Sequence, residues 1–220
     1  MDIGLAFSYI TRDREWVKKV LIGGVISIIP IVGAFVLYGY AVRIVRNVLD
    51  NVPDPLPEWD DFGAYLTNGF LAFVGVFIWG APLFILAFCL LIFGSINDAA
   101  SILSLLGWCL VYPLLFLYMV VVPPILIGRF AMSGNFNSML EFNEVIAQIR
   151  SVGVGPYAML LVLAVAASII SSLGLIACVI GVLFTSAFAN YALAHGAAQL
   201  YRIAQSGGTG GTPPPERPAF

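Results

Sequence analysis

Four long stretches of this chain contain no Asp, Glu, Lys or Arg, and they restrict its fold more than any other feature. They cover residues 20–42, 62–97, 99–128 and 151–201. The hydrocarbon core of a bilayer excludes charged side chains, and a helix needs about 20 apolar residues to cross it. Each stretch reaches that length. The sequence therefore predicts an all-α integral membrane protein that crosses the bilayer several times.

Composition agrees with a membrane protein and argues against other classes. The 220 residues are 60% hydrophobic and 10% charged, whereas soluble domains carry about 25% charged residues. The net charge of -2 offers no basic surface for nucleic acid. The three cysteines lie in apolar runs and show no metal-ligand spacing. No catalytic motif is visible, so we predict no cofactor, no metal site and no catalytic residue.

Helix-breaking residues divide the long stretches into hairpins. Residues 94–98 and 171–174 are rich in Gly, Ser and Asn, so we expect helices near 69–93, 101–127, 154–172 and 175–200. The stretch 20–42 has Pro30 near its centre, and proline removes a helical hydrogen bond. It is either one kinked span or a short hairpin that re-enters the same side of the membrane.

The basic residues favour the re-entrant hairpin. All 10 Lys and Arg flank the uncharged stretches, and the breaks at 94–98 and 171–174 contain none. A hairpin turning at Pro30 places all of them on one side, whereas a single span would divide them. Basic residues favour the cytoplasmic side of a membrane. We therefore expect a protein of the cell membrane with both termini in the cytoplasm.

A short amphipathic helix is expected in the interface before each hairpin. Residues 58–66 align with 141–149, and large apolar residues recur at i, i+3 and i+7 in both copies. Residues 3–10 form a weaker third copy. The expected interfacial anchors are Trp16, Trp59, Phe62 and Phe142. Residues 1–205 form one membrane domain, and the Gly/Thr/Pro-rich stretch 206–220 is predicted to be a disordered tail.

Polar and charged residues near the membrane are the candidates for function. Those that could line a polar path through the last hairpin are Ser168, Ser172, Thr185, Asn190 and His195. The simpler interpretation is that small residues at every fourth position allow two helices to pack closely. Those that could contact lipid headgroups or a partner are Arg43, Arg46, Asp60, Asp61, Arg129 and Arg202.

Several short motifs give the chain a resemblance to a known family. Residues 13–19 lead into Gly23-Gly24, and residues 29–33 follow; the most specific motif is 56–61, followed by Asn68-Gly69. Further matching positions are 39–40, 43, 46, 129–130, 141–142, 196 and 201–202. This pattern resembles DUF4013, an uncharacterised membrane family of bacteria and archaea, over about residues 1–205. The family usually has an acid where this chain has Asn68. The resemblance implies a membrane protein and no particular activity.

Three functional hypotheses follow from the sequence. The leading one is a non-enzymatic structural, lipid-organising or accessory subunit, whose partners are membrane lipids, other membrane subunits or a second copy of the chain. The alternative is a small transporter or channel for an uncharged or lipid-like substrate, which requires a polar cavity between hairpins. The least favoured is an enzyme acting on lipid headgroups, which requires Asp60, Asp61, Glu141 or Glu144 to converge.

Overall fold

The fold is built from helices throughout the part of the chain that the structure describes. The computed structural model describes residues 1–53 and 56–207, without the side chains of residues 176–180. Most of the predicted tail lies outside these residues. The helices are α1 (Ile3–Arg12), α2 (Trp16–Ile26), α3 (Val32–Leu49), α4 (Phe62–Gly94), α5 (Asp98–Ser133), α6 (Phe142–Val152), α7 (Val154–Leu173) and α8 (Cys178–Gly207), with 3-10 turns at Phe136–Met139 and Gly174–Ala177.

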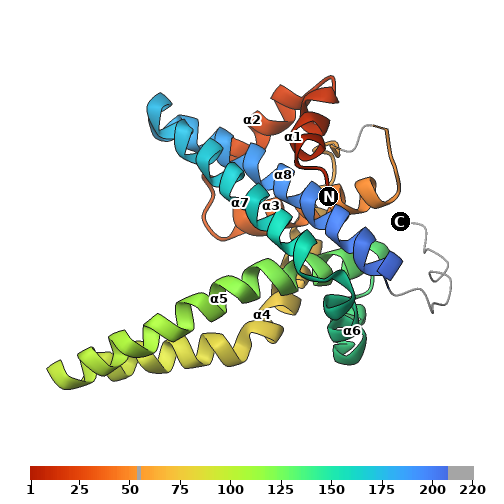
Figure 1. The fold of residues 1–220 in the computed structure, drawn as a ribbon. Helices are drawn as coiled ribbons and strands as arrows, with labels where there is room; N and C mark the ends of the chain where they lie inside the picture. Colours follow the sequence, from red (N-terminus) through yellow and green to blue (C-terminus); the bar gives the residue numbers. More distant parts are fainter. Residues whose placement is uncertain (54–55, 208–220) are drawn as a thin grey trace.

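Among the described residues, four helices are long and apolar enough to cross a membrane, judged by length and composition: α3, α4, α5 and α7. This confirms the predicted all-α membrane fold and identifies the chain as a multi-pass membrane protein. Figure 1 shows α4 and α5 extending side by side away from the other helices, while α7 and α8 form a second elongated pair. The α4–α5 turn falls at residues 95–97, inside the break that the sequence predicted.

The uncharged stretch 20–42 is broken, as the proline suggested. Helix α2 ends at Ile26, α3 begins at Val32, and Pro30 lies between them. Ile31 has a positive φ of 65°, which is uncommon for a β-branched residue and marks a sharp change of chain direction.

The first predicted surface helix does not form as a separate element. Residues 62–66 are instead the first turns of α4, which runs without interruption to Gly94. The Asp61 side chain caps this helix by accepting a hydrogen bond from the backbone N–H of Ala64 at 2.9 Å. The second copy does form a short separate helix, α6, which ends at Gly153 with a φ of 73°. The weaker N-terminal copy corresponds to α1.

Helix α8 is the centre of the molecule. It lies against α1, α2, α3, α5, α6 and α7, and its buried face is rich in alanine. Small side chains let the surrounding helices approach closely. Helices α3 and α4 cross without an intervening side chain, because Gly39 faces the backbone of Tyr65 and Gly69 faces that of Phe35.

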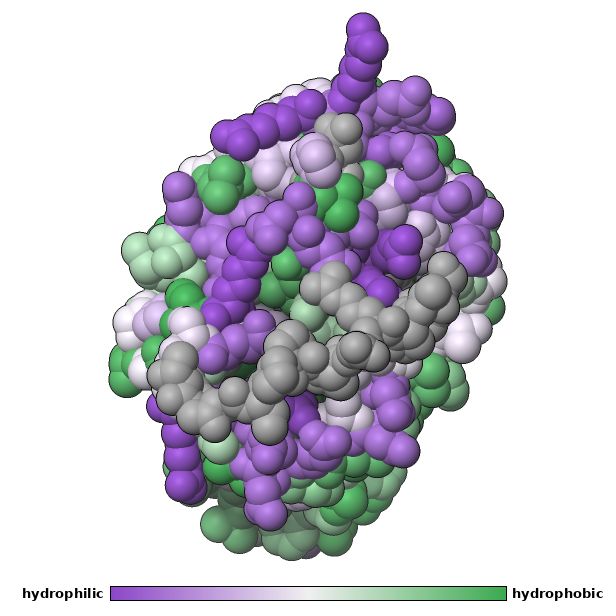
Figure 2. Space-filling view, turned by 90° about the vertical axis from the view of Figure 1, so that its right-hand side faces the viewer, coloured by the Kyte–Doolittle hydropathy of each residue, from purple (hydrophilic) through white to green (hydrophobic). Residues whose placement is uncertain are grey.

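Polar side chains gather on one face of the molecule. Figure 2 shows this face, which is the right-hand side of Figure 1. The α4–α5 and α7–α8 pairs extend away from it (Figure 1), and their outer surfaces carry most of the exposed large apolar side chains. An apolar surface at one end and a polar surface at the other is the arrangement expected of a protein inserted in a bilayer.

Candidate functional site

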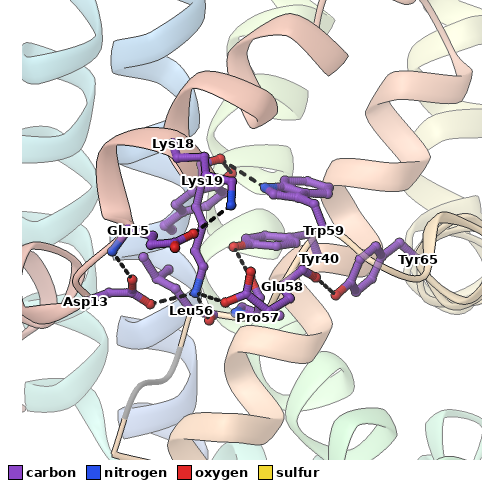
Figure 3. A network of polar contacts seen from close by, with 11 residues as sticks. Asp13, Glu15, Lys18, Lys19, Tyr40, Leu56, Pro57, Glu58, Trp59 and Tyr65 are labelled. Atoms are coloured by element: carbon purple, nitrogen blue, oxygen red, sulfur yellow. Dashed lines mark hydrogen bonds and ion pairs between the residues drawn. The ribbon is translucent and has the colours of Figure 1, made fainter.

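A buried lysine stands at the polar end of α2. The Lys19 side chain is only 5% exposed, and its ammonium group donates to Asp13 Oδ2 at 2.8 Å, to Glu58 Oε1 at 2.7 Å and to the carbonyl of Leu56 at 2.9 Å (Figure 3). These contacts use all three donors of the ammonium group. Asp13 is equally buried, whereas the Glu58 side chain is 60% exposed.

The two carboxylates keep Lys19 charged. Burial by itself disfavours the charged ammonium group. The hydrogen bonds from Lys19 to Asp13 and Glu58, and the charges of these residues, outweigh that effect and raise the pKa of Lys19 above its ordinary value. The group is therefore protonated at neutral pH, and its charge is neutralised within the protein.

Trp59, which follows Glu58 in the chain, joins two helices. Its indole ring stacks on Tyr40 of α3, with ring centroids 4.0 Å apart and an interplanar angle of 8°. Its Nε1–H donates to the backbone carbonyl of Lys19 at 3.0 Å. Trp59 therefore touches α2 and α3 at the same level (Figure 3). We call Lys19, Tyr40, Glu58 and Trp59 the first clamp.

The backbone before Trp59 is held at three consecutive residues. The carbonyls of residues 56–58 accept hydrogen bonds, in order, from the side chains of Lys19, Tyr40 and Tyr65 (Figure 3). A buried loop must satisfy its backbone polar groups, and these side chains do so. The most specific motif of the sequence, residues 56–61, is therefore the segment that the first clamp holds.

The second repeat carries a similar arrangement, which we call the second clamp. Arg129 of α5 contacts Glu141 and donates to the carbonyl of Ser138 at 2.7 Å. Phe142 packs against Trp79 of α4 at a centroid distance of 4.6 Å, with the two rings tilted by 32°. Trp79 Nε1–H in turn donates to the carbonyl of Met139 at 2.8 Å. In both clamps a basic side chain, a glutamate and two aromatic rings fix the loop that follows a helical hairpin.

His195 lies in a polar contact between α1 and α8. Its ring stacks on Tyr9 at a centroid distance of 4.4 Å, and its Nδ1 lies 3.0 Å from Gln199 Nε2. Gln199 also exchanges two hydrogen bonds with the backbone of Asp2. His195 therefore anchors the N-terminal helix.

The other candidates for a polar path bond to backbone carbonyls in the helices. Ser168 and Ser172 donate to the carbonyls four residues earlier, as does the exposed Asn190. Thr185 bonds to Gly181 of its own helix and to Ser171 of α7. The structure brings only Ser168 and Ser172 together, in a groove of about 430 Å³ that is otherwise lined by Phe116, Leu161, Ala164, Val165, Ile169 and Leu173.

The predicted anchors lie in different surroundings. Trp59 and Phe142 belong to the two clamps, and the exposed Phe62 stacks on Trp59 at 5.8 Å. Trp16 is half-buried and lies edge-on to Phe188 at 6.2 Å. Whether any of these side chains sits at a lipid interface remains a prediction.

The predicted headgroup contacts are also dispersed. Arg129 belongs to the second clamp, Asp61 caps α4, and Arg202 bonds to the carbonyl of Val48 and to Asn51. Arg46 lies 3.8 Å from Asp50, while Arg43 and Asp60 are exposed. Within residues 1–53 and 56–207, no group of three or more His, Cys, Asp or Glu side chains could hold a metal ion.

Sequence analysis missed Asp13 and Lys19 as structural residues. In the sequence they stood out only as charges before an apolar stretch and as members of the motif at residues 13–19. The available signal was their spacing: Asp13 and Lys19 lie six residues apart, on either side of the start of α2, and both side chains are buried in the structure. The partner Glu58 lies 39 residues later, so local pattern alone could not pair them.

The fold and the two clamps define a multi-pass helical membrane protein in which Lys19 and Arg129, each with a glutamate partner, hold the loops that follow two hairpins. The chain belongs to the family described as "Protein of unknown function (DUF4013)", which matches residues 22–193 and confirms the resemblance seen in the sequence. Glu58, Trp59 and the whole second clamp fall inside the matched region, whereas Asp13 and Lys19 precede it.

One curated relative has a significant partial match. The chain is 36% identical over 67 residues to the uncharacterized protein MJ1189 of Methanocaldococcus jannaschii. The match covers 30% of this chain and 23% of that protein, so it spans about a quarter of the relative's length. No solved structure matches this chain.

Proposed function

We propose that this protein has a non-enzymatic role in the membrane, as a structural, lipid-organising component or an accessory subunit. The observation that carries the proposal is the apolar surface of the α4–α5 pair. Large apolar side chains are exposed along both helices, including Ile85 at 62%, Leu105 at 65% and Leu110 at 71%. A surface of this size contacts lipid or another membrane protein rather than water.

The charged residues of the polar end support the same proposal. A catalytic acid or base must be within reach of the proton that it transfers to or from a substrate. Lys19 uses every donor inside the protein, and Arg129 is held by Glu141 and Ser138. These groups therefore serve to fix loops between hairpins.

The test combines reconstitution with native mass spectrometry. The protein is placed in phosphatidylcholine vesicles with a trace of spin-labelled phosphatidylcholine, and protein-free vesicles are the control. We expect a motionally restricted lipid signal that grows with the protein-to-lipid ratio. We also expect bound lipid, a second copy or a partner chain to survive gentle release into detergent. A lipid-free lone chain together with an unchanged lipid signal would refute the proposal.

A transporter for a lipid-like substrate is the second candidate. The groove between α5 and α7 is not the polar cavity that this hypothesis required, but an apolar groove of this size could accommodate an acyl chain. Its volume of about 430 Å³ is within the ~300–1,000 Å³ of small-molecule sites, and its lining is apolar apart from Ser168 and Ser172. A fluorescent-lipid scrambling assay tests this. Ser168→Phe, which fills the groove, should slow scrambling, whereas Ser95→Phe in the α4–α5 turn should not. Absence of scrambling by the unaltered protein rejects this candidate.

A further inference from the structure

The outer face of α2 is an apolar stripe without a protein partner among the described residues. Val17, Leu21 and Val25 follow one another at intervals of four and are 50%, 43% and 58% exposed. The opposite face, which includes Gly23 and Gly24, is buried against α8, where Tyr191 and Phe184 occupy the space beside these glycines. The exposed stripe must be covered by something apolar.

The turn between α2 and α3 is also apolar and exposed. Ile28, Ile29, Ile31 and Val32 are 61%, 52%, 72% and 48% exposed, on either side of Pro30. Turns that face water are rich in Gly, Asn, Asp and Ser, and the α4–α5 turn, with Ser95 and Asn97, follows that rule. The α2–α3 turn does not, so water is a poor environment for it.

The backbone of this turn makes its hydrogen bonds internally. The N–H groups of residues 27–29, 32, 33 and 35 all donate to carbonyls within residues 23–31. Pro30 has no N–H to satisfy, and the Ser27 hydroxyl donates to the carbonyl of Gly24. Lipid offers no hydrogen-bonding partner, so these internal hydrogen bonds lower the free-energy cost of placing the turn in hydrocarbon.

The two arms of this hairpin return to the same level. Lys19 lies eleven residues before Pro30 and Tyr40 ten residues after it, and both contact Trp59. Eleven residues of helix rise about 16 Å, which is roughly half of the ~30 Å hydrocarbon core. Helix α3 is long enough to cross a bilayer by length alone, but its second half, with Arg43 and Arg46, continues past the level of Trp59 away from the tip. The part of the hairpin between Trp59 and the tip is therefore too short to cross a bilayer, and the tip would stop near the midplane.

Basic side chains surround the wide end of the hairpin. Arg12, Arg14 and Lys18 are exposed there. Lys18 is paired with Glu15 at 2.7 Å, whereas no ion pair engages Arg12 or Arg14 within residues 1–53 and 56–207. Lys19 is neutralised by Asp13 and Glu58, so Arg12 and Arg14 are the exposed cations that remain at this end. Two exposed arginines above an apolar wedge complement lipids that join an anionic phosphate to hydrocarbon chains.

We infer that the α2–α3 hairpin inserts into one leaflet as a wedge and that Arg12 and Arg14 bind the headgroups of anionic lipids around it. The inference rests on the proposed lipid-organising function and names the class of lipid. The apolar stripe and tip contact acyl chains, while the arginines select the charge of the headgroup.

The depth of the wedge is tested with spin labels. Single cysteines are placed at Leu21, Val25 and Ile29 on a background without native cysteines, with Ile96 in the α4–α5 turn as the control. In vesicles, exposure to oxygen should rise from Leu21 to Ile29, and exposure to a water-soluble nickel complex should fall. An Ile29 label as accessible to nickel as the Ile96 label would overturn the wedge.

The choice of lipid is tested with spin-labelled phosphatidylglycerol and phosphatidylcholine. The unaltered protein should prefer phosphatidylglycerol in its restricted shell. Each arginine near a membrane surface contributes about a fivefold preference, so Arg12→Gln/Arg14→Gln should lose much of the selectivity, whereas Arg12→Lys/Arg14→Lys should keep it. High salt should weaken it.

Two negative outcomes are distinguishable. A restricted shell that shows equal affinity for both lipids would refute the anionic-lipid inference and leave the lipid-organising role standing. Absence of any restricted shell would refute the proposed function itself.

Discussion

Replacing Gly39 by alanine tests the close crossing of α3 and α4. A Cβ at this position would lie 1.8 Å from the carbonyl oxygen of Tyr65 and 2.9 Å from the backbone nitrogen of Gly69. Real Cβ contacts are essentially never shorter than 3.0 Å, so the helices must separate by about 1.2 Å at this point. The atoms in conflict belong to backbone and cannot move aside alone.

The cost follows from the contacts that this separation weakens. A gap of about 0.5–1 Å already loses a quarter to a half of the dispersion attraction between facing atoms, and Phe35 of α3 packs against Phe70 and Phe73 of α4 in the same interface. Overpacking in a close-packed interior costs about 1–3 kcal/mol. We expect Gly39→Ala to destabilise the protein by about 2 kcal/mol, or a fall of ~4–8 °C in melting temperature.

Thermal unfolding in a mild detergent, followed by tryptophan fluorescence, measures this effect. The matched control is Gly63→Ala in the first turn of α4, where the nearest atom to a new Cβ is 3.7 Å away. This change should be neutral or slightly stabilising, because alanine favours helix over glycine. The double variant Gly39→Ala/Gly69→Ala should cost less than the sum of the single changes, since the same separation relieves both conflicts. A Gly39→Ala protein as stable as the Gly63→Ala control would refute the crossing.

Two further predictions concern the clamps. Lys19→Met should destabilise the protein by about 3 kcal/mol, because it leaves the buried Asp13 without its cation. The double variant Asp13→Asn/Lys19→Met should recover part of this loss. The control Lys18→Met changes an exposed lysine and should leave the melting temperature unchanged. An effect of Lys18→Met as large as that of Lys19→Met would contradict the burial of the ion cluster. Glu141→Gln should increase proteolysis between Ser133 and Phe142, because Arg129 loses the partner that helps it hold this loop. The control is Glu144→Gln. Equal cleavage of both variants would count against the second clamp.

The membrane fold could be predicted from the sequence because the bilayer imposes a simple rule. The charge-free stretches predicted α4, α5 and α7. The helix-breaking residues predicted the turns between helices to within a few residues of their observed positions. The prediction of a separate helix at 58–66 was wrong, because α4 begins at Phe62 and continues through Gly69 without interruption. Gly69 lies within α4 and provides the space that the backbone of Phe35 occupies, which is a long-range contact that no local pattern reveals.

The two clamps could not be predicted from the sequence either, because their contacts join residues that lie far apart in the chain. The repeat at residues 58–66 and 141–149 was visible, yet its meaning lay in partners from distant helices. Glu58 pairs with Lys19, and Phe142 packs against Trp79, which lies 63 residues earlier. The sequence could not reveal that Trp59 stacks on Tyr40, and its predicted position at the membrane interface stays a prediction.

The most direct test of the arrangement is the sidedness of single cysteines. On a background without native cysteines, Ser8, Asn137 and Ser206 mark the polar end, and Ile96 marks the α4–α5 turn. In oriented membranes, a reagent that cannot cross the bilayer should label the first three from one side only and Ile96 from the other side only. Labelling of Ser8 from the side opposite to Asn137 and Ser206 would contradict the common polar end and the re-entrant hairpin together.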